Sequence, residues 1–157
     1  MDDAELRAQL EQLHQVSFGW ALSCCRHDPH EAEDVLHIAY QKILQGKARY
    51  DGRSAFKTWL FGVVRLTAAN ERRRHWLRQL RLSQYEAPVA SETGLADVLL
   101  AALGKLPRRQ REVLHLVFHQ DLTIEEAAGI MGVSLGSART HYARGKQRLA
   151  EWLQDER

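Results

Sequence analysis

The sequence predicts an all-α fold made of two small helical domains joined by a linker. Apolar residues recur with the 3.6-residue period of a helix almost throughout, and proline occurs only three times in 157 residues. Between the two periodic regions, residues 83–94 combine proline, serine and threonine with little apolar periodicity, which is typical of a linker. We therefore expect domains at residues 1–82 and 95–157.

The composition excludes several classes of protein. Hydrophobic residues make up 45% of the chain, which is enough to bury a core and argues against global disorder. No apolar run approaches the roughly 20 residues that cross a bilayer. The acidic start at residues 1–5 does not resemble a signal peptide. We therefore expect a cytoplasmic protein without a membrane partner.

The two cysteines, Cys24 and Cys25, are adjacent, and neighbours on one helix point in different directions. They do not form a disulfide framework, and the nearby histidines follow no standard zinc spacing. Buried thiols and solvated histidines explain this segment better than a metal site does. We expect neither a metal nor any other cofactor.

Charge is distributed unevenly along the chain, although the net charge is only +2. Residues 1–50 carry a net charge of −3, and residues 51–90 carry +5. An acidic start followed by a basic middle indicates two surfaces with different partners. Solvated helix faces would give the same pattern, so the charge distribution alone does not show whether the chain has two such binding surfaces.

Helix signals follow one another through the N-terminal half. A first helix begins with the apolar series Leu6, Leu10 and Leu13. Asp28-Pro29 then interrupts the helical pattern. Proline suits the first turn of a second helix, and the positive end of the helix dipole favours the acidic residues that follow. Gly46 is expected to end that helix, and Asp51-Gly52 marks a turn. Ser54 can cap a third helix, with the apolar positions Phe56, Trp59, Leu60, Val63 and Val64.

Aromatic and basic residues alternate around the start of this third helix. Such a mixture can hold unpaired bases, because rings stack on bases and cations contact phosphates. Trp59 fits the apolar stripe, so we assign it to the core, and Tyr50, in an expected loop, is the better candidate for touching a base. The candidate DNA-binding residues of this half are Tyr50, Lys57, Arg65, Arg72, Arg73 and Arg74.

The C-terminal half contains the sharpest local signal. A helix over residues 95–103 should end at Gly104, and Pro107 should open the next, with Val113, Leu114, Val117 and Phe118 as its apolar residues. Thr123 and Glu126 then form a capping box for a short helix over residues 124–131. Gly132 supplies the positive φ of a tight turn, and Ser134 caps a second helix that runs to about residue 153. This order predicts a helix-turn-helix.

The second helix of this motif has two distinct faces. Its packing side carries Ala138, Tyr142, Gly145, Leu149 and Trp152. Its other side is rich in hydrogen-bond donors and has no acidic residue between Ser134 and Ala150, which suits a helix in the major groove. An ordinary exposed helix would mix in acidic residues. The candidate DNA-binding residues here are Ser137, Arg139, Thr140, His141, Arg144 and Arg148.

Three segments of this half, residues 106–114 (LPRRQREVL), 122–128 (LTIEEAA) and 137–146 (SARTHYARGK), resemble the C-terminal domain of extracytoplasmic-function sigma factors of the sigma-70 family. In that family the domain recognises the minus-thirty-five promoter element. The resemblance implies that the positions of Arg139, Thr140, Ala143 and Arg144 lie at the DNA.

The N-terminal half is similar to the other domain of the same family. Residues 31–35 (EAEDV) match the acidic start of its polymerase-binding helix, and residues 56–74 match the segment that melts and recognises the minus-ten element. The sequence departs from the family at His37 and Ile38, where a Gln-acid pair is usual, and at Leu66, where asparagine is frequent. The candidate polymerase-binding residues are Glu31, Glu33, Asp34 and His37.

The favoured function is thus that of a sigma factor, with core RNA polymerase and promoter DNA as partners and an anti-sigma factor left open as a third. A stand-alone helix-turn-helix regulator is the main alternative, but it would not need a basic aromatic segment. A helical interaction module, such as an anti-sigma protein, would not need an acid-free recognition face. An enzyme is least supported, because no paired carboxylates, Ser-His-Asp set or glycine-rich phosphate loop is present.

Overall fold

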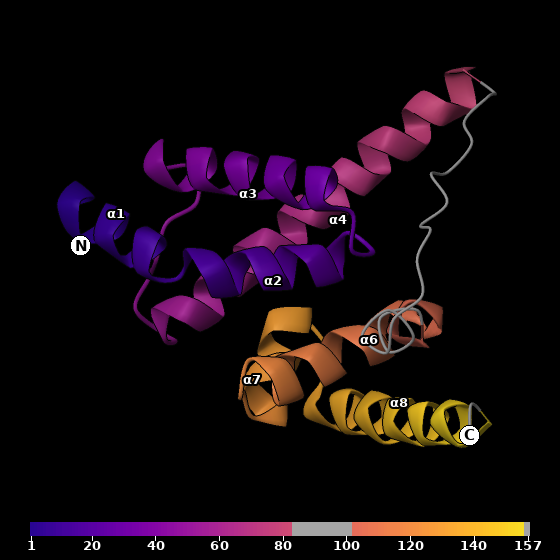
Figure 1. The fold of residues 1–157 in the computed structure, drawn as a ribbon. Coiled ribbons are helices and arrows are strands. Elements are labelled where there is room, and N and C mark those ends of the chain that lie inside the picture. Colours follow the sequence, from indigo (N-terminus) through magenta and orange to yellow (C-terminus); the bar gives the residue numbers. More distant parts are fainter. Residues whose placement is uncertain (83–101, 156–157) are drawn as a thin grey trace.

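A computed structural model describes residues 1–82 and 102–155 of the chain, and across these residues the regular structure is helical, without strands (Figure 1). The all-α expectation is therefore confirmed. No described helix combines the length and apolar character needed to cross a bilayer. The elements are α1 (Asp3–Gln12), α2 (His14–Cys24), α3 (Pro29–Leu44), α4 (Phe56–Leu82), α6 (Arg108–Leu114), the π-helical turn η1 (His115–His119), α7 (Ile124–Met131) and α8 (Leu135–Asp155).

Helices α2, α3 and α4 pack on one another to form the core of the N-terminal half. Trp20 of α2 is fully buried, and its indole Nε1 donates a hydrogen bond of 2.9 Å to the carbonyl of Phe61 on α4. The rings of these two residues also stack, with centroids 5.8 Å apart. A buried indole needs such a partner for its N–H, so this contact ties α2 firmly to α4.

The expected helix ends are mostly confirmed. The Asp28 side chain accepts hydrogen bonds from the backbone N–H groups of His30 and Glu31, with Pro29 in the first turn of α3. Gly46 follows the end of α3 with a positive φ of 76°. The expected cap at Ser54 is wrong, because α4 begins at Phe56 and the Ser54 hydroxyl instead donates to the carbonyl of Ala55.

The C-terminal half contains α6, η1, α7 and α8. The helix predicted over residues 95–103 lies outside the described residues up to residue 101. The backbone is helical over residues 102–105, so the expectation that Gly104 ends a helix is wrong. Pro107 precedes α6 as expected, but α6 passes at His115 into the π-helical turn η1 instead of continuing as one α-helix. Phe118, on this turn, is 60% exposed.

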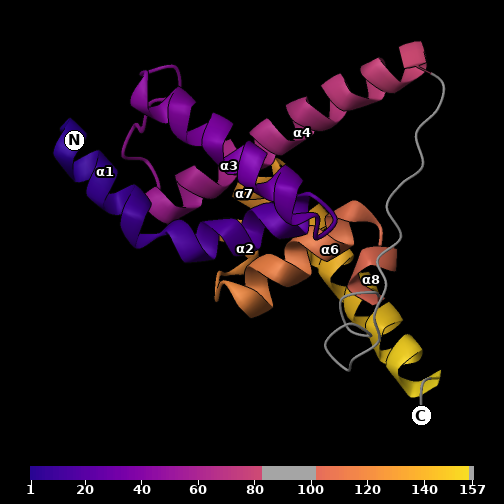
Figure 2. The same cartoon turned by 45° about the horizontal axis from the view of Figure 1, so that its top comes forward.

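The two halves pack against each other, which the sequence did not predict. Helix α7 contacts α4 extensively and is partly hidden behind it in Figure 2. Val113, Leu116 and Ile130 of the C-terminal half belong to the same buried cluster as Trp20 and Leu60. The C-terminal part of α4 projects away from this shared core (Figure 1). The predicted linker, residues 83–94, lies outside the described residues.

Candidate nucleic-acid interface

The helix-turn-helix has the local geometry that the sequence predicted. Thr123 Oγ1 accepts from the backbone N–H of Glu126 at 3.0 Å, and the Glu126 carboxylate accepts from the N–H of Thr123 at 3.2 Å. Gly132 adopts the left-handed conformation at φ 68°. Ser134 Oγ accepts from the N–H of Ser137 at 3.1 Å, so it caps α8. These bonds satisfy backbone N–H groups at the starts of α7 and α8, and Gly132 makes the turn between the two helices.

Helix α8 presents the donor-rich face to solvent. Ala138 and Gly145 are buried on the opposite side, as the helical wheel predicted. The candidates Ser137, Arg139, Thr140, Arg144 and Arg148 are exposed, and His141 is half-buried. The Thr140 hydroxyl donates to the carbonyl of Gly136 at 3.0 Å, so in this conformation it offers a nucleic acid an acceptor and not a donor.

The acidic start of α3 is also exposed. Glu31, Glu33, Asp34 and His37 all point to solvent, whereas Ala32, Val35, Leu36 and Ala39 form the buried stripe. The helix therefore packs through its apolar face and leaves the acidic face free for another molecule. His37 lies within 3.4 Å of the Gln41 side-chain amide, one turn further along.

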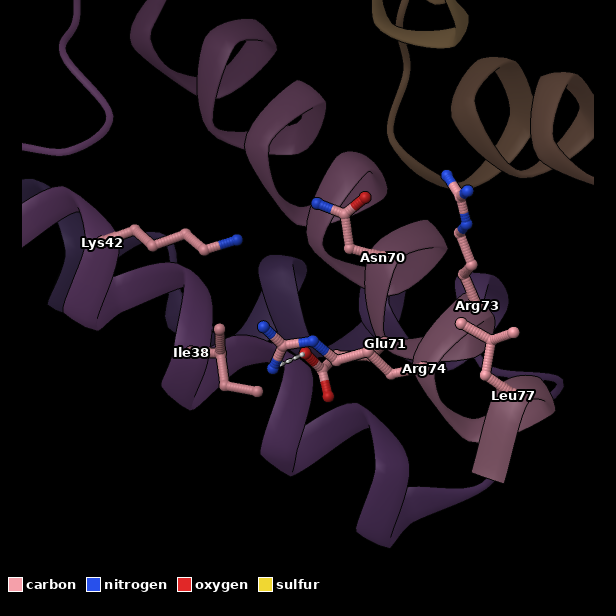
Figure 3. Close-up of a pocket in the computed structure, with 7 residues that line it drawn as sticks. All are labelled: Ile38, Lys42, Asn70, Glu71, Arg73, Arg74 and Leu77. Carbon is pink, nitrogen blue, oxygen red and sulfur yellow. Dashed lines mark ion pairs between the residues drawn. The ribbon is translucent and has the colours of Figure 1, made fainter. Parts of the chain in front are cut away.

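Four of the five candidate basic residues of α4 form two groups, and the fifth, Arg72, is half-buried. Arg73 and Arg74 are exposed and line a surface pocket of about 460 Å³ with Lys42 of α3 (Figure 3). Arg74 forms an ion pair of 3.6 Å with Glu71, and the two arginines point in different directions from the helix. Exposed cations of this kind are available for phosphates.

The second group, Lys57 and Arg65, lies where α4 meets the C-terminal half. Lys57 Nζ donates to the carbonyl of Gln120 at 3.2 Å. Arg65 Nε lies 2.6 Å from the carboxylate of Glu112. In this arrangement neither side chain reaches a nucleic acid without leaving its partner, so their DNA contacts remain predictions for another arrangement of the halves.

Tyr50 is half-buried in an aromatic cluster. Its ring centroid lies 5.3 Å from that of Phe56 and 5.4 Å from that of Trp59, and its hydroxyl donates to the carbonyl of Ser54. Trp59 packs against the core, as the sequence predicted. A base contact by Tyr50 stays a prediction, and it would compete with these contacts.

A group of buried charges in α6 was not evident from the sequence. Glu112 is 1% exposed, and Arg111 is also buried, donating to the carbonyls of Ser23 and Leu106. Burial lowers the pKa of Arg111 and of Arg108. The four-residue spacing of Arg108 and Glu112 could have indicated an ion pair, but nothing local showed that it would be buried.

Both cysteines are shielded from solvent. Cys24 and Cys25 are buried free thiols, and burial raises the pKa of Cys25 to about 12 and that of Cys24 well above its ordinary value. His27 is half-buried, so the expectation of a solvated histidine is wrong there, and burial lowers its pKa. Among the described residues, no three His, Cys, Asp or Glu side chains are grouped as metal ligands.

The two halves match two regions of one protein family. Residues 10–78 match Sigma-70 region 2, and residues 96–149 match Sigma-70 region 4. RNA polymerase sigma factor YlaC of Bacillus subtilis is 31% identical over 134 residues, covering 78% of each chain. ECF RNA polymerase sigma factor SigF of Caulobacter vibrioides is 30% identical over 127 residues, covering 78% of this chain and 71% of that one. The chain belongs to the extracytoplasmic-function sigma factors.

Solved structures of other sigma factors share the fold of this sigma factor across both of its halves. The sigma factor RpoE of Bartonella quintana, in complex with the anti-sigma factor NepR, matches with a TM-score of 0.81 at 23% identity, covering 98% of this chain and 99% of that chain. CnrH, in complex with the cytosolic domain of CnrY, matches with a TM-score of 0.67 at 21% identity, covering 96% and 88%. Sigma factors are, as a class, initiation factors of transcription and not enzymes.

Proposed function

We propose that this sigma factor binds core RNA polymerase through the acidic start of α3 and recognises the minus-thirty-five element through the donor face of α8. The observation that carries the first assignment is the division of α3 into a buried apolar stripe and an exposed acidic face. An acidic cluster at a helix start that makes no ion pair within the described residues is suited to a basic partner surface.

The DNA-binding assignment rests on α8. Arg139, Arg144 and Arg148 are exposed there, and an arginine fork can donate to O6 and N7 of one guanine. The exposed Arg73 and Arg74 of α4 would contact phosphates of the minus-ten region, with Lys42 beside them. Because the net charge is only +2, we expect the free protein to bind DNA weakly and to depend on polymerase.

The remaining aspects of function follow from this assignment. We infer that the chain catalyses no reaction itself and acts in the cytoplasm, beside polymerase and DNA. RpoE is solved with an anti-sigma factor, and we infer a partner of the same class for this chain. A stand-alone regulator is less well supported, because it would leave the acidic face of α3 without a role.

Charge reversal tests the polymerase assignment. The double variant Glu33→Lys with Asp34→Lys should no longer co-elute with core RNA polymerase and should lose run-off transcription from genomic fragments. The matched control, Asp3→Lys with Glu11→Lys, makes the same charge change at exposed positions of α1 and should co-elute normally. Circular dichroism should show unchanged helix content in both variants. Normal co-elution of the α3 variant would refute the assignment.

A further inference from the structure

Helices α4 and α6 are joined by a buried ion pair between residues far apart in the chain. Arg65 Nε lies 2.6 Å from Glu112 Oε2, and its Nη2 lies 3.4 Å from Oε1, across a separation of 47 residues. The Glu112 side chain is 1% exposed and that of Arg65 is 19% exposed. A two-point contact between a guanidinium and a shielded carboxylate is among the strong polar interactions of proteins.

Positive charge exceeds negative charge around this contact. We define the arginine junction as Arg65 and Arg72 of α4 together with Arg108, Arg111 and Glu112 of α6. Arg108 also contacts Glu112, at 3.5 Å. The positive charges of Arg72 and Arg65 help to lower the pKa of Arg108. One amino nitrogen of Arg72 is buried without a hydrogen-bond partner. Glu112 thus pairs with an arginine of each helix, Arg65 of α4 and Arg108 of α6.

A second contact lies along the same face of α4. Lys57 donates to the carbonyl of Gln120, and the Gln120 side-chain amide donates to the carbonyl of Val16 on α2 at 3.3 Å. The two contacts engage Lys57 and Arg65, both of which the sequence assigned to promoter DNA. The donor face of α8 and the acidic face of α3 take no part in the junction and are exposed.

With its two halves packed together, an arrangement that we call closed, the protein is too short to reach both promoter elements at once. The minus-ten and minus-thirty-five elements are about 25 base pairs apart, which is about 85 Å of duplex at ~3.4 Å per base pair. A compact chain of this length has a radius of gyration of about 15 Å, so it spans about half of that distance or less. The halves must therefore separate before α4 and α8 can contact both elements.

We propose that Glu112 is an autoinhibitory residue, which holds the free sigma factor closed by occupying the arginine that promoter phosphates would otherwise bind. The carboxylate and a phosphate compete for the same guanidinium, so closure and minus-ten contact exclude each other. Polymerase can still meet the exposed acidic face of α3 in the closed form. The inference rests on the proposed role of α4 at the promoter, and it adds how that role is suppressed in the free protein.

Neutralising Glu112 in the full-length free protein tests the proposal. Glu112→Gln keeps the shape of the side chain but removes its charge, so the radius of gyration from small-angle X-ray scattering should increase. Affinity for a single-stranded dT20 oligonucleotide should rise about tenfold, as expected for one freed charge-assisted contact. The salt slope of that binding should steepen by about 0.7. The control Glu11→Gln removes a carboxylate at an exposed position of α1, away from the junction, and should change neither quantity.

Two further variants keep the test decisive. Arg65→Gln should expand the protein without the gain in dT20 affinity, because the freed arginine is itself missing. The exchange Arg65→Glu with Glu112→Arg should restore compactness and weak dT20 binding. If Glu112→Gln or Arg65→Gln stays as compact as the wild type, or if Glu112→Gln expands without binding dT20 more tightly, the proposal is wrong. Co-elution of the wild type with core polymerase is scored separately, so a failed α3 assignment is distinguished from a failed autoinhibitory role.

Discussion

Gly145 of α8 lies directly against Leu114 of α6. A Cβ atom placed on Gly145 would be 2.9 Å from Leu114 Cδ1 and 3.2 Å from the Cβ of Gln110, closer than side chains normally approach. Leu114 is itself buried. The absence of a side chain at position 145 therefore sets how closely α8 packs on α6, and this packing turns the donor face of α8 outward.

Gly145→Ala should destabilise the protein although alanine favours helices. The helix propensity gain is about 1 kcal/mol, whereas overpacking a well-filled site costs about 1–3 kcal/mol, so we expect a net loss of about 1 kcal/mol. Urea denaturation measures it. Gly129→Ala in α7 is the matched control, because nothing lies within 4 Å of its added Cβ, and it should stabilise the protein. Equal stabilisation by both substitutions would show that Leu114 does not constrain α8.

Arg144 and Arg139 should contribute differently to promoter recognition. Arg144 lies centrally on the donor face, so Arg144→Ala should reduce discrimination at one or two base pairs by about 1–3 kcal/mol. Arg139 lies on the flank, so Arg139→Ala should weaken binding evenly across sequences and reduce the salt slope by about 1. Transcription from a randomised promoter library with the polymerase holoenzyme measures the first effect, and salt-dependent holoenzyme binding measures the second. An Arg144→Ala variant with full wild-type base preference would mean that α8 docks differently.

Stability should fall as the pH decreases below about 6.5, in part because of His115. Its ring packs against Trp20, with centroids 5.5 Å apart, and burial, aided by His119 and His27, lowers its pKa from 6.5 to about 3. Between these two values the unfolded chain binds a proton that the folded chain does not. Each pH unit in that window therefore costs about 1.4 kcal/mol of folding stability.

His115→Phe removes this proton binding while keeping an aromatic ring against Trp20. Between pH 6.5 and pH 5 the wild type should lose about 2 kcal/mol more unfolding free energy than the variant. Urea denaturation at several pH values measures the difference. His30→Gln, at an exposed position near the start of α3, serves as the control and should retain the wild-type dependence. An unchanged pH dependence in His115→Phe would falsify the role of this histidine.

The local parts of the molecule could be predicted from the sequence alone. The capping box of Thr123 and Glu126, the left-handed Gly132 and the cap at Ser134 each depend on residues within four positions of one another. The two faces of α8 follow in the same way from helical periodicity. Local spacing therefore sufficed to place the donor face, because the interactions that define it are made along the chain and not across it.

The packing of the two halves on each other, in contrast, is visible only in the folded structure. Arg65 meets Glu112 across 47 residues, and Lys57 meets Gln120 across 63 residues. The sequence contains 22 basic and 20 acidic residues, so periodicity could not show which charges would pair and become buried. Packing of the two halves around a shared buried cluster brings these side chains together. The same residues that appear in the sequence as free promoter contacts are thereby engaged within the protein.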